Sequence, residues 1–322
     1  MKIGQIYNLE AFKGFRDSAN QPGFKDAQAG VVLERNLEAI DPTIFEKKYP
    51  ELSFVNSGID ADNTGGYVEK IRSLRTQPVG AFRTAGDKSV EKGKISMSGE
   101  TTFLDVVGRE AESDWTKTQI EQAALQNINL PSKFIEGHNR IYQRELDEIG
   151  YLGVPDIAGS EGLLNYSGFT SVAATGAIAG LTPQQMYDDI AGLVIAQWNA
   201  VNNTPEYMAN RVDMPIYALN QLSVEILNTA AGPANVLMAL KANFPGVEFR
   251  GTFRADNAGG VGVSHTVAYN NNSEAMKMRI PQPLEVGEIV KISSFRFHVE
   301  TMYRIGGLDV LEDTAGYILT GL

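Results

Sequence analysis

The clearest pattern in the sequence is an apolar stripe between residues 132 and 149. Its members recur every three or four positions, which is the spacing of one face of an α-helix. They are Phe134, Ile135, His138, Ile141, Tyr142, Leu146 and Ile149. Pro131 stands where such a helix would start, and Gly150 stands where a C-terminal glycine belongs. At 1.5 Å per residue the helix spans about 27 Å, so the pattern predicts a long, spine-like element.

Alternating apolar and polar positions predict strands further along the chain. Residues 295–305 place Phe, Val, Thr, Tyr and Ile side chains on one face and charged or polar ones on the other, as expected for a strand with one buried face. Residues 211–255 predict a compact α/β unit with a short strand around Met214 and another over residues 247–254. Between them we expect two helices, one containing Leu222 to Leu227 and one containing Val236 to Phe244.

Two capping boxes mark further helix starts. Thr116 is followed three residues later by Gln119, and Thr182 by Gln185, which is the spacing of a reciprocal side-chain cap. Pro183 occupies the first helical position after Thr182, where proline is favoured. The sequence therefore predicts a helix after each threonine.

Two segments carry apolar residues without enough of them to build a core. Residues 1–50 scatter Phe12, Phe15 and other aromatics among glycine and proline, and predict an arm. Residues 67–111 predict a long β-hairpin with its tip near residues 86–94, because Gly86-Asp87 and Lys92-Gly93-Lys94 are turn-forming. A lone two-stranded hairpin is marginally stable in water. Each segment therefore needs a surface to lie on, either its own domain or a neighbouring subunit.

Composition narrows the class of protein. The chain has 322 residues, no cysteine and a net charge of −11. Disulfides and thiolate chemistry are excluded, and we expect neither a membrane span nor a secretory signal. The net charge argues against specific nucleic-acid binding, and it fits either a solubility role or an acidic wall around DNA. The predicted hairpin is the most basic region, through Lys70, Arg72, Arg75, Arg83, Lys88, Lys92 and Lys94.

No catalytic constellation is present in the sequence. His138 lies on the apolar helical stripe and reads as a packed core histidine, while His298 reads as part of a solvated charge cluster. The segment from Asp60 begins like a calcium loop but has Ile71 where a bidentate Glu is required, so a turn is the better interpretation. We therefore expect no enzyme, no cofactor and no metal site, although two carboxylates that meet only in space would escape this test.

Several short segments, taken in order, resemble the major capsid proteins of tailed phages with the Hong Kong 97-type fold. The resemblance covers most of the chain and rests on the order and spacing of segments that are individually weak. They are Leu33–Pro42, Tyr49–Leu52, Asn63–Tyr67, Glu161–Asn165, Val267–Tyr269, Ile280–Pro283 and Arg304–Gly307.

The resemblance implies an α+β fold with a fixed order of parts. Residues 1–52 would be the N-terminal arm and 53–112 the extended β-hairpin loop. Residues 113–200 would form the peripheral domain with its spine helix, and 201–290 the axial α/β domain. Residues 291–322 would return as C-terminal strands that complete the peripheral and axial sheets.

The implied function is the icosahedral head shell that encloses the double-stranded DNA of a tailed phage without sequence-specific binding. The chain would form pentamers and hexamers, be assembled in the host cytoplasm, and end in the virion. Scaffolding, portal and decoration proteins are further partners that the resemblance allows. The residues expected at subunit interfaces are Phe12, Phe15, Arg83, Lys88, Lys92 and Lys94.

Two alternatives remain at this point. An encapsulin-like nanocompartment would keep the fold and change the role, and its shells would co-purify with an enzyme cargo. A soluble α/β enzyme using a carboxylate pair would instead be a monomer or small oligomer with a pocket.

Overall fold

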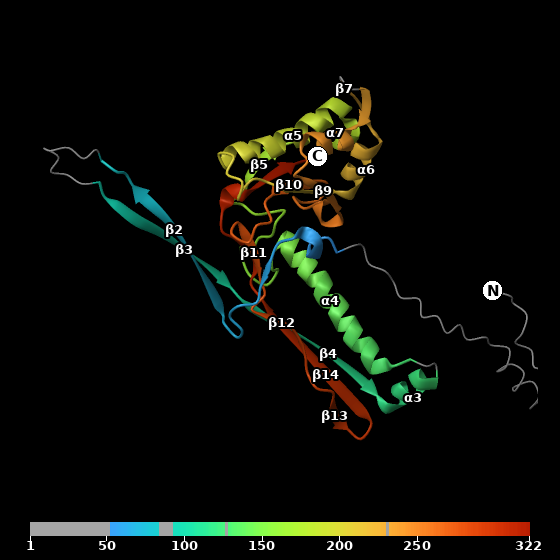
Figure 1. Cartoon of the computed structure of the whole chain (residues 1–322). Coiled ribbons are helices and arrows are strands. Elements are labelled where there is room, and N and C mark those ends of the chain that lie inside the picture. The colour runs from blue at the N-terminus through green and yellow to red at the C-terminus, as the bar shows by residue number, and fades with distance from the viewer. Residues whose placement is uncertain (1–51, 84–92, 126–127, 230–231) are drawn as a thin grey trace, which may run out of the picture. The chain divides into compact units, whose positions relative to one another are not determined.

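A computed structural model describes residues 52–83, 93–125, 128–229 and 232–322 (Figure 1). Phe12, Phe15, Lys88 and Lys92 lie outside these residues. Within the described part of the chain, no helix combines the length and the apolar character needed to cross a membrane.

A mixed five-stranded sheet carries the main core of the C-terminal half. In sheet order its strands are β5 (Thr170–Ala173), β16 (Gly316–Thr320), β10 (His265–Tyr269), β6 (Arg211–Pro215) and β9 (Glu248–Thr252). The helices that pack with them are α5 (Pro183–Ala200), α6 (Ile216–Val224) and α7 (Val236–Asn243). The outer pairs, β5 with β16 and β6 with β9, are parallel, and the inner pairs are antiparallel.

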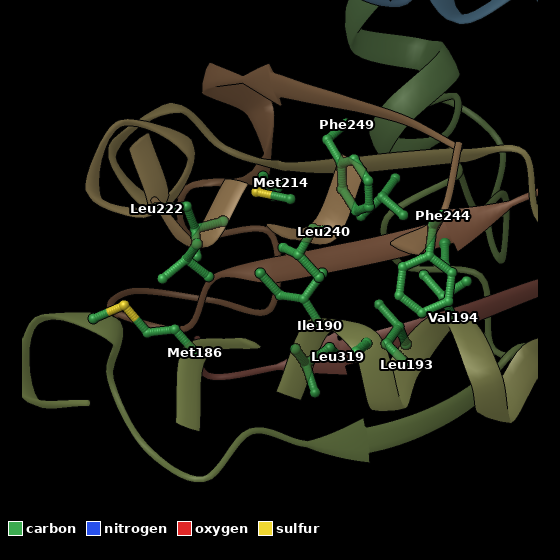
Figure 2. Close-up of a cluster of buried hydrophobic side chains, with 14 of the residues drawn as sticks. Met186, Ile190, Leu193, Val194, Met214, Leu222, Leu240, Phe244, Phe249 and Leu319 are labelled. Atoms are coloured by element: carbon green, nitrogen blue, oxygen red, sulfur yellow. The ribbon is translucent and has the colours of Figure 1, made fainter. Parts of the chain in front are cut away.

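The core of this unit lies between the sheet and its helices (Figure 2). Ile190 of α5 and Leu240 of α7 are fully buried and lie close to Leu319 of β16. Since a fully buried aliphatic side chain contributes about 1.5–3 kcal/mol, this cluster is a major source of the subunit's stability. We refer to it as the axial unit.

The local signals for the axial unit are mostly confirmed. The capping box predicted at Thr182 is present, with the Thr182 side chain and the Gln185 side chain each bonded to the other's backbone. The helix predicted through Leu227 is wrong, because α6 ends at Val224. Residues Ile226–Thr229 instead form β7, which pairs with β8 (Gly232–Asn235) in a small hairpin, so tertiary pairing overrides the apolar spacing.

The predicted spine helix is confirmed as α4 (Leu130–Leu152), preceded by α3 (Lys117–Leu125). The Asn129 side chain caps α4 by accepting a hydrogen bond from the Ser132 amide at 3.4 Å. The predicted cap at Thr116 is also present, since the Gln119 amide donates to the Thr116 hydroxyl at 3.3 Å.

A second sheet packs against α4. It contains β12 (Gln282–Val286), β14 (Arg296–Ile305), β13 (Val290–Ser293) and β4 (Val107–Thr116), and β4 pairs with β14 along its whole length. The predicted alternation in β14 is confirmed, with Val299, Tyr303 and Ile305 buried. Trp115 of β4 stacks on Phe134 of α4, with ring centroids 5.2 Å apart. We call this sheet, together with α3 and α4, the peripheral unit.

The predicted hairpin is confirmed for its strands, β2 (Lys70–Gly80) and β3 (Ile95–Asp105), which pair over their full length. Residues 84–92, which include most of the tip predicted near residues 86–94, lie outside the described residues. Next to the hairpin lies a three-stranded sheet of β1 (Ala61–Asp62), β11 (Met276–Arg279) and β15 (Gly307–Val310). Short 3-10 turns occur at Val55–Ser57, Ile178–Gly180, Phe253–Ala255 and Asp313–Ala315.

Candidate functional site

The hairpin of β2 and β3 has one apolar face that nothing in the described subunit covers. The register of the two strands fixes which side chains share a face, because residues directly opposite each other point to the same side. Leu74 lies opposite Thr101, Arg72 opposite Phe103, and Pro78 opposite Met97. Five apolar side chains fall on the same face, which we call the hairpin's apolar face. They are Leu74, Pro78, Ile95, Met97 and Phe103. Leu74, Ile95, Met97 and Phe103 are each more than half exposed.

The opposite face of the hairpin is held by its own subunit near its base. The buried Ser73 of β2 donates a 2.7 Å hydrogen bond from its hydroxyl to Asp309. Arg75 forms an ion pair with Glu312. The base is therefore anchored through one face, and the apolar face is left for another partner.

Arg279 of β11 organises this anchor. Its Nε lies 2.9 Å from Asp309 Oδ2, its guanidinium also pairs with Asp62, and a second nitrogen lies 3.1 Å from the Ser73 hydroxyl. Hydrogen bonds from Thr64, and then the charge of Arg279, lower the pKa of Asp62. The Thr64 amide donates a 2.9 Å hydrogen bond to the Asp62 carboxylate, which confirms the turn predicted for this segment.

The predicted interface residues of the hairpin are only partly described. Arg83 and Lys94 are exposed and lie just beyond the ends of β2 and β3. Closer to the base, Lys70 pairs with Asp105 at 3.0 Å, and Arg75 pairs with Glu312. Lys70 and Arg75 are thus paired within the subunit, whereas Arg72 donates a hydrogen bond to the Thr101 hydroxyl at 3.3 Å.

A groove of about 470 Å³ separates α4 from the sheet of the peripheral unit. His138 lies in it with its ring nitrogens 2.7 Å from the Ser113 hydroxyl and 2.6 Å from the Thr301 hydroxyl. The predicted packed, hydrogen-bonded histidine is confirmed. In a catalytic Ser–His pair, a carboxylate orients the histidine through its second ring nitrogen. The second nitrogen of His138 contacts Thr301 instead, so the contact between Ser113 and His138 is structural.

The sheet face turned away from α4 carries a cluster of acidic side chains around His298, between Arg296 and Arg304. Cross-strand pairing sets Asp114 opposite His298 and Glu112 opposite Glu300. The His298 ring lies 2.6 Å from Asp114 and 2.8 Å from Glu300, and these hydrogen bonds, that of Glu300 first, raise the pKa of His298. The charge cluster predicted for His298 is confirmed, and its members come from two strands.

A buried polar cluster joins α4 to the axial unit. The fully buried Asp213 accepts hydrogen bonds from the Tyr151 hydroxyl at 2.8 Å and the Tyr269 hydroxyl at 3.2 Å. Burial raises the pKa of Asp213, against the opposing charge of Arg250, whose Nε lies 3.8 Å away. Sequence reasoning missed this cluster because its members belong to four separate segments.

A second contact fixes the chain at the C-terminal end of α4. Asp147 accepts a 2.9 Å hydrogen bond from the Phe54 amide and pairs with Arg254 at 3.1 Å. The Phe54 ring lies directly on Gly150, where an added Cβ would approach the ring to 2.5 Å. Gly150 therefore provides a close-packing position inside α4 and not the helix end that the sequence suggested.

Comparison with known proteins decides the family. Residues 83–321 match the model of the major capsid protein family. The structure is similar to "the capsid of Myoviridae Phage XM1", with 42% sequence identity, a TM-score of 0.79, and coverage of 89% of this chain and 98% of that chain. The chain belongs to the major capsid protein family. It is a subunit of a phage head shell.

More distant structures share the fold of this capsid subunit. The capsid of a native GTA particle is 13% identical with a TM-score of 0.62, covering 87% of this chain and 95% of that chain. A Mycobacterium phage Ogopogo chain is 12% identical with a TM-score of 0.58, covering 90% and 98%. The fold is thus the Hong Kong 97-type fold. No curated protein matches the sequence significantly, and no comparison supports a nanocompartment or an enzyme.

Proposed function

We propose that the capsid subunit closes into an icosahedral shell of pentamers and hexamers by laying its hairpin across a neighbouring subunit. The single observation that carries this proposal is the hairpin's apolar face. The hairpin is anchored through one face by the hydrogen bonds and ion pairs of Arg279, while Leu74, Met97 and Phe103 remain exposed on the other face. Burying such a face at a heterologous contact, repeated around a ring, gives a closed assembly.

The parts of the chain are proposed to take the family's roles. Residues 1–52 serve as the arm, 53–112 as the extended loop, 113–200 as the peripheral domain and 201–290 as the axial domain, with 291–322 completing the sheets. In the structure, β4 spans the boundary at residue 112, β5 and α5 of the 113–200 segment belong to the axial unit, and β12 of the 201–290 segment pairs with β14 in the peripheral sheet. The two domains are thus tied together by strands from distant segments.

The proposal is tested by size-exclusion chromatography and negative-stain electron microscopy of the purified full chain. Closed shells, tubes, or regular pentamers and hexamers are expected. The contrary result is a chain that remains a monomer or dimer at high concentration, both alone and when co-expressed with scaffolding, portal and decoration proteins. That result would contradict assembly through the hairpin.

Charge at the hairpin end gives a sharper test. We propose that Lys88, Lys92 and Lys94 face acidic surface on a neighbouring subunit, since complementary charge sets register between partners. Replacing all three by Glu should impair assembly and leave the subunit folded. Lys94→Glu alone should show a smaller defect, and Lys241→Glu, an equally exposed charge reversal on α7, should assemble normally. Normal particles from the triple variant would overturn the charge argument.

We further propose that Phe12 and Phe15 of the arm bury their rings on neighbouring subunits, and that Arg83 joins the basic hairpin end. Assembly in the host cytoplasm, into a shell that encloses double-stranded DNA, is part of the same proposal, and the net charge of −11 fits a shell that does not read the DNA sequence. Scaffolding, portal and decoration proteins are the proposed additional partners. Co-purification from infected cells would identify each of them.

A further inference from the structure

The acidic face of the peripheral unit contains a feature that shell assembly does not explain. Glu112 and Glu300 lie directly opposite each other on β4 and β14. Like charges at directly opposed cross-strand positions destabilise a sheet. The adjacent pair, Asp114 with His298, adds another carboxylate on the same face. A bound cation would relieve the repulsion between these carboxylates.

We propose that Glu112, His298 and Glu300 bind a divalent transition-metal ion, with Zn²⁺ as the best-fitting species. Each residue offers one ligand atom, and the three atoms all lie within 4.8 Å of one another. One imidazole nitrogen and two carboxylate oxygens suit Zn²⁺, whereas sites made only of oxygen suit Mg²⁺ or Ca²⁺.

The distances permit closure around an ion with small side-chain movements. Ligand bonds to Zn²⁺ of about 2.0 Å place two donors of a tetrahedral site roughly 3.3 Å apart. The His298 Nε2 and Glu300 Oε1 atoms are 2.8 Å apart, so they need to separate slightly. Glu112 and Glu300 are exposed and therefore free to rotate towards the ion. Water would supply the remaining ligand.

Asp114 supplies the outer partner that such a histidine requires. Its carboxylate lies 2.6 Å from His298 Nδ1, which fixes the ring and turns Nε2 towards the two glutamates. A metal-bound histidine in most proteins donates its second ring N–H to a carboxylate or carbonyl in this manner. Asp114 is thus a positioning residue in this site.

Solvent, and any ion dissolved in it, reaches Glu112 and Glu300, which are both exposed. Beside Glu112 and Glu300 lies a hollow of about 430 Å³ whose lining also includes Glu110 and Glu285. Among the residues that the structure describes, this lining contains no Lys or Arg. The printed sequence could not reveal the site, because Glu112 and His298 are far apart in the chain and the expectation of no metal rested on local spacing.

The test is zinc binding by isothermal titration calorimetry to chelator-treated, unassembled full-length subunits. We expect saturable binding of one ion per chain, with Mg²⁺ unable to compete. His298→Gln, Glu112→Gln and Glu300→Gln should each weaken binding by at least about tenfold, and Asp114→Asn by about 10- to 100-fold. Circular dichroism and the urea midpoint establish that each variant is folded.

The matched control is Glu110→Gln, which removes the same charge from the same face of β4 but is not a ligand. It should change zinc affinity by less than about threefold, because a solvent-exposed charge that does not coordinate the ion interacts with it only weakly through water and salt. If Glu110→Gln weakened zinc binding as much as the ligand variants, or if His298→Gln bound zinc unchanged, zinc would be attracted by the general acidic charge of the surface and not by a defined site. Either result would overturn the proposal.

An absence of saturable zinc binding would overturn it as well. If Glu112→Gln and Glu300→Gln then alter shell assembly, the face takes a basic side chain from a neighbouring subunit instead. Since the titration uses unassembled subunits, its outcome is independent of whether the hairpin mechanism of assembly is correct.

Discussion

The axial unit and the hairpin treat their apolar residues in opposite ways. In the axial unit, Leu240 and Ile190 are fully buried against side chains of the same subunit. In the hairpin, Leu74 is 62% exposed and Phe103 67% exposed, although they share one face of an ordered strand pair. Solvent-exposed apolar faces of this kind mark interaction sites.

The difference teaches where each region obtains its stability. The axial unit buries a large apolar cluster within the subunit, whereas two strands alone are marginal in water. The hairpin's shape within the subunit comes from its base, where Arg279, Asp309 and Ser73 hold one face. Folding and assembly are therefore assigned to different residues, and substitutions should separate them.

The largest effect on folding is expected from the axial core. Leu240→Ala should lower the free energy of unfolding by about 2–5 kcal/mol, because it removes a fully buried side chain and leaves a cavity. Urea unfolding of isolated subunits measures this. Met238→Ala on the same helix, where the side chain is 63% exposed, should cost less than about 0.5 kcal/mol. Similar losses in both variants would argue against the core described for the axial unit.

A loss within the same range is expected at the hairpin base. Arg279→Met should lower the free energy of unfolding by about 3 kcal/mol, because it leaves the carboxylate of Asp309 buried without its cation. It should also loosen the hairpin, which amide hydrogen exchange in β2 and β3 would report. Arg72→Met, an exposed arginine of the same hairpin, serves as the control and should change neither quantity appreciably. Unchanged exchange in Arg279→Met would show that the base does not hold the strands.

A pH dependence of this base follows from Asp62. Its pKa is lower in the folded protein, so its contribution is fully present above the ordinary carboxyl pKa of about 4 and is lost as the pH falls through the lowered value. The difference in urea midpoint between the wild type and Asp62→Asn should therefore shrink on acidification. A difference that stays constant down to about pH 2 would contradict the lowered pKa.

The smallest effect on folding, and the sharpest on assembly, is expected at the hairpin's apolar face. Leu74→Ser should change the free energy of unfolding by less than about 0.5 kcal/mol, because the side chain is already exposed. Particle yield in electron microscopy should nevertheless fall. Val79→Ser, on the opposite face of the same strand, is the matched control and should give a higher particle yield than Leu74→Ser. Equal yields from both variants would remove the special role of the apolar face.

Local patterns were sufficient for elements whose signal is contained in one segment. The stripe from Phe134 to Ile149 predicted α4, the alternation in residues 295–305 predicted β14, and the Thr182 capping box predicted the start of α5. They failed at Ile226, where the partner strand β8 and not the local spacing decides the structure.

The sequence by itself determined the long helix, the hairpin strands, the absence of thiol chemistry and the resemblance to capsid proteins, because each depends on residue types or on short-range spacing. Only the tertiary structure decided that Asp213 meets Tyr151 and Tyr269, and that Glu112 faces Glu300 beside His298. These contacts join segments far apart in the chain, and the free energy of pairing depends on which strands become neighbours. Local propensity contains no information about that choice.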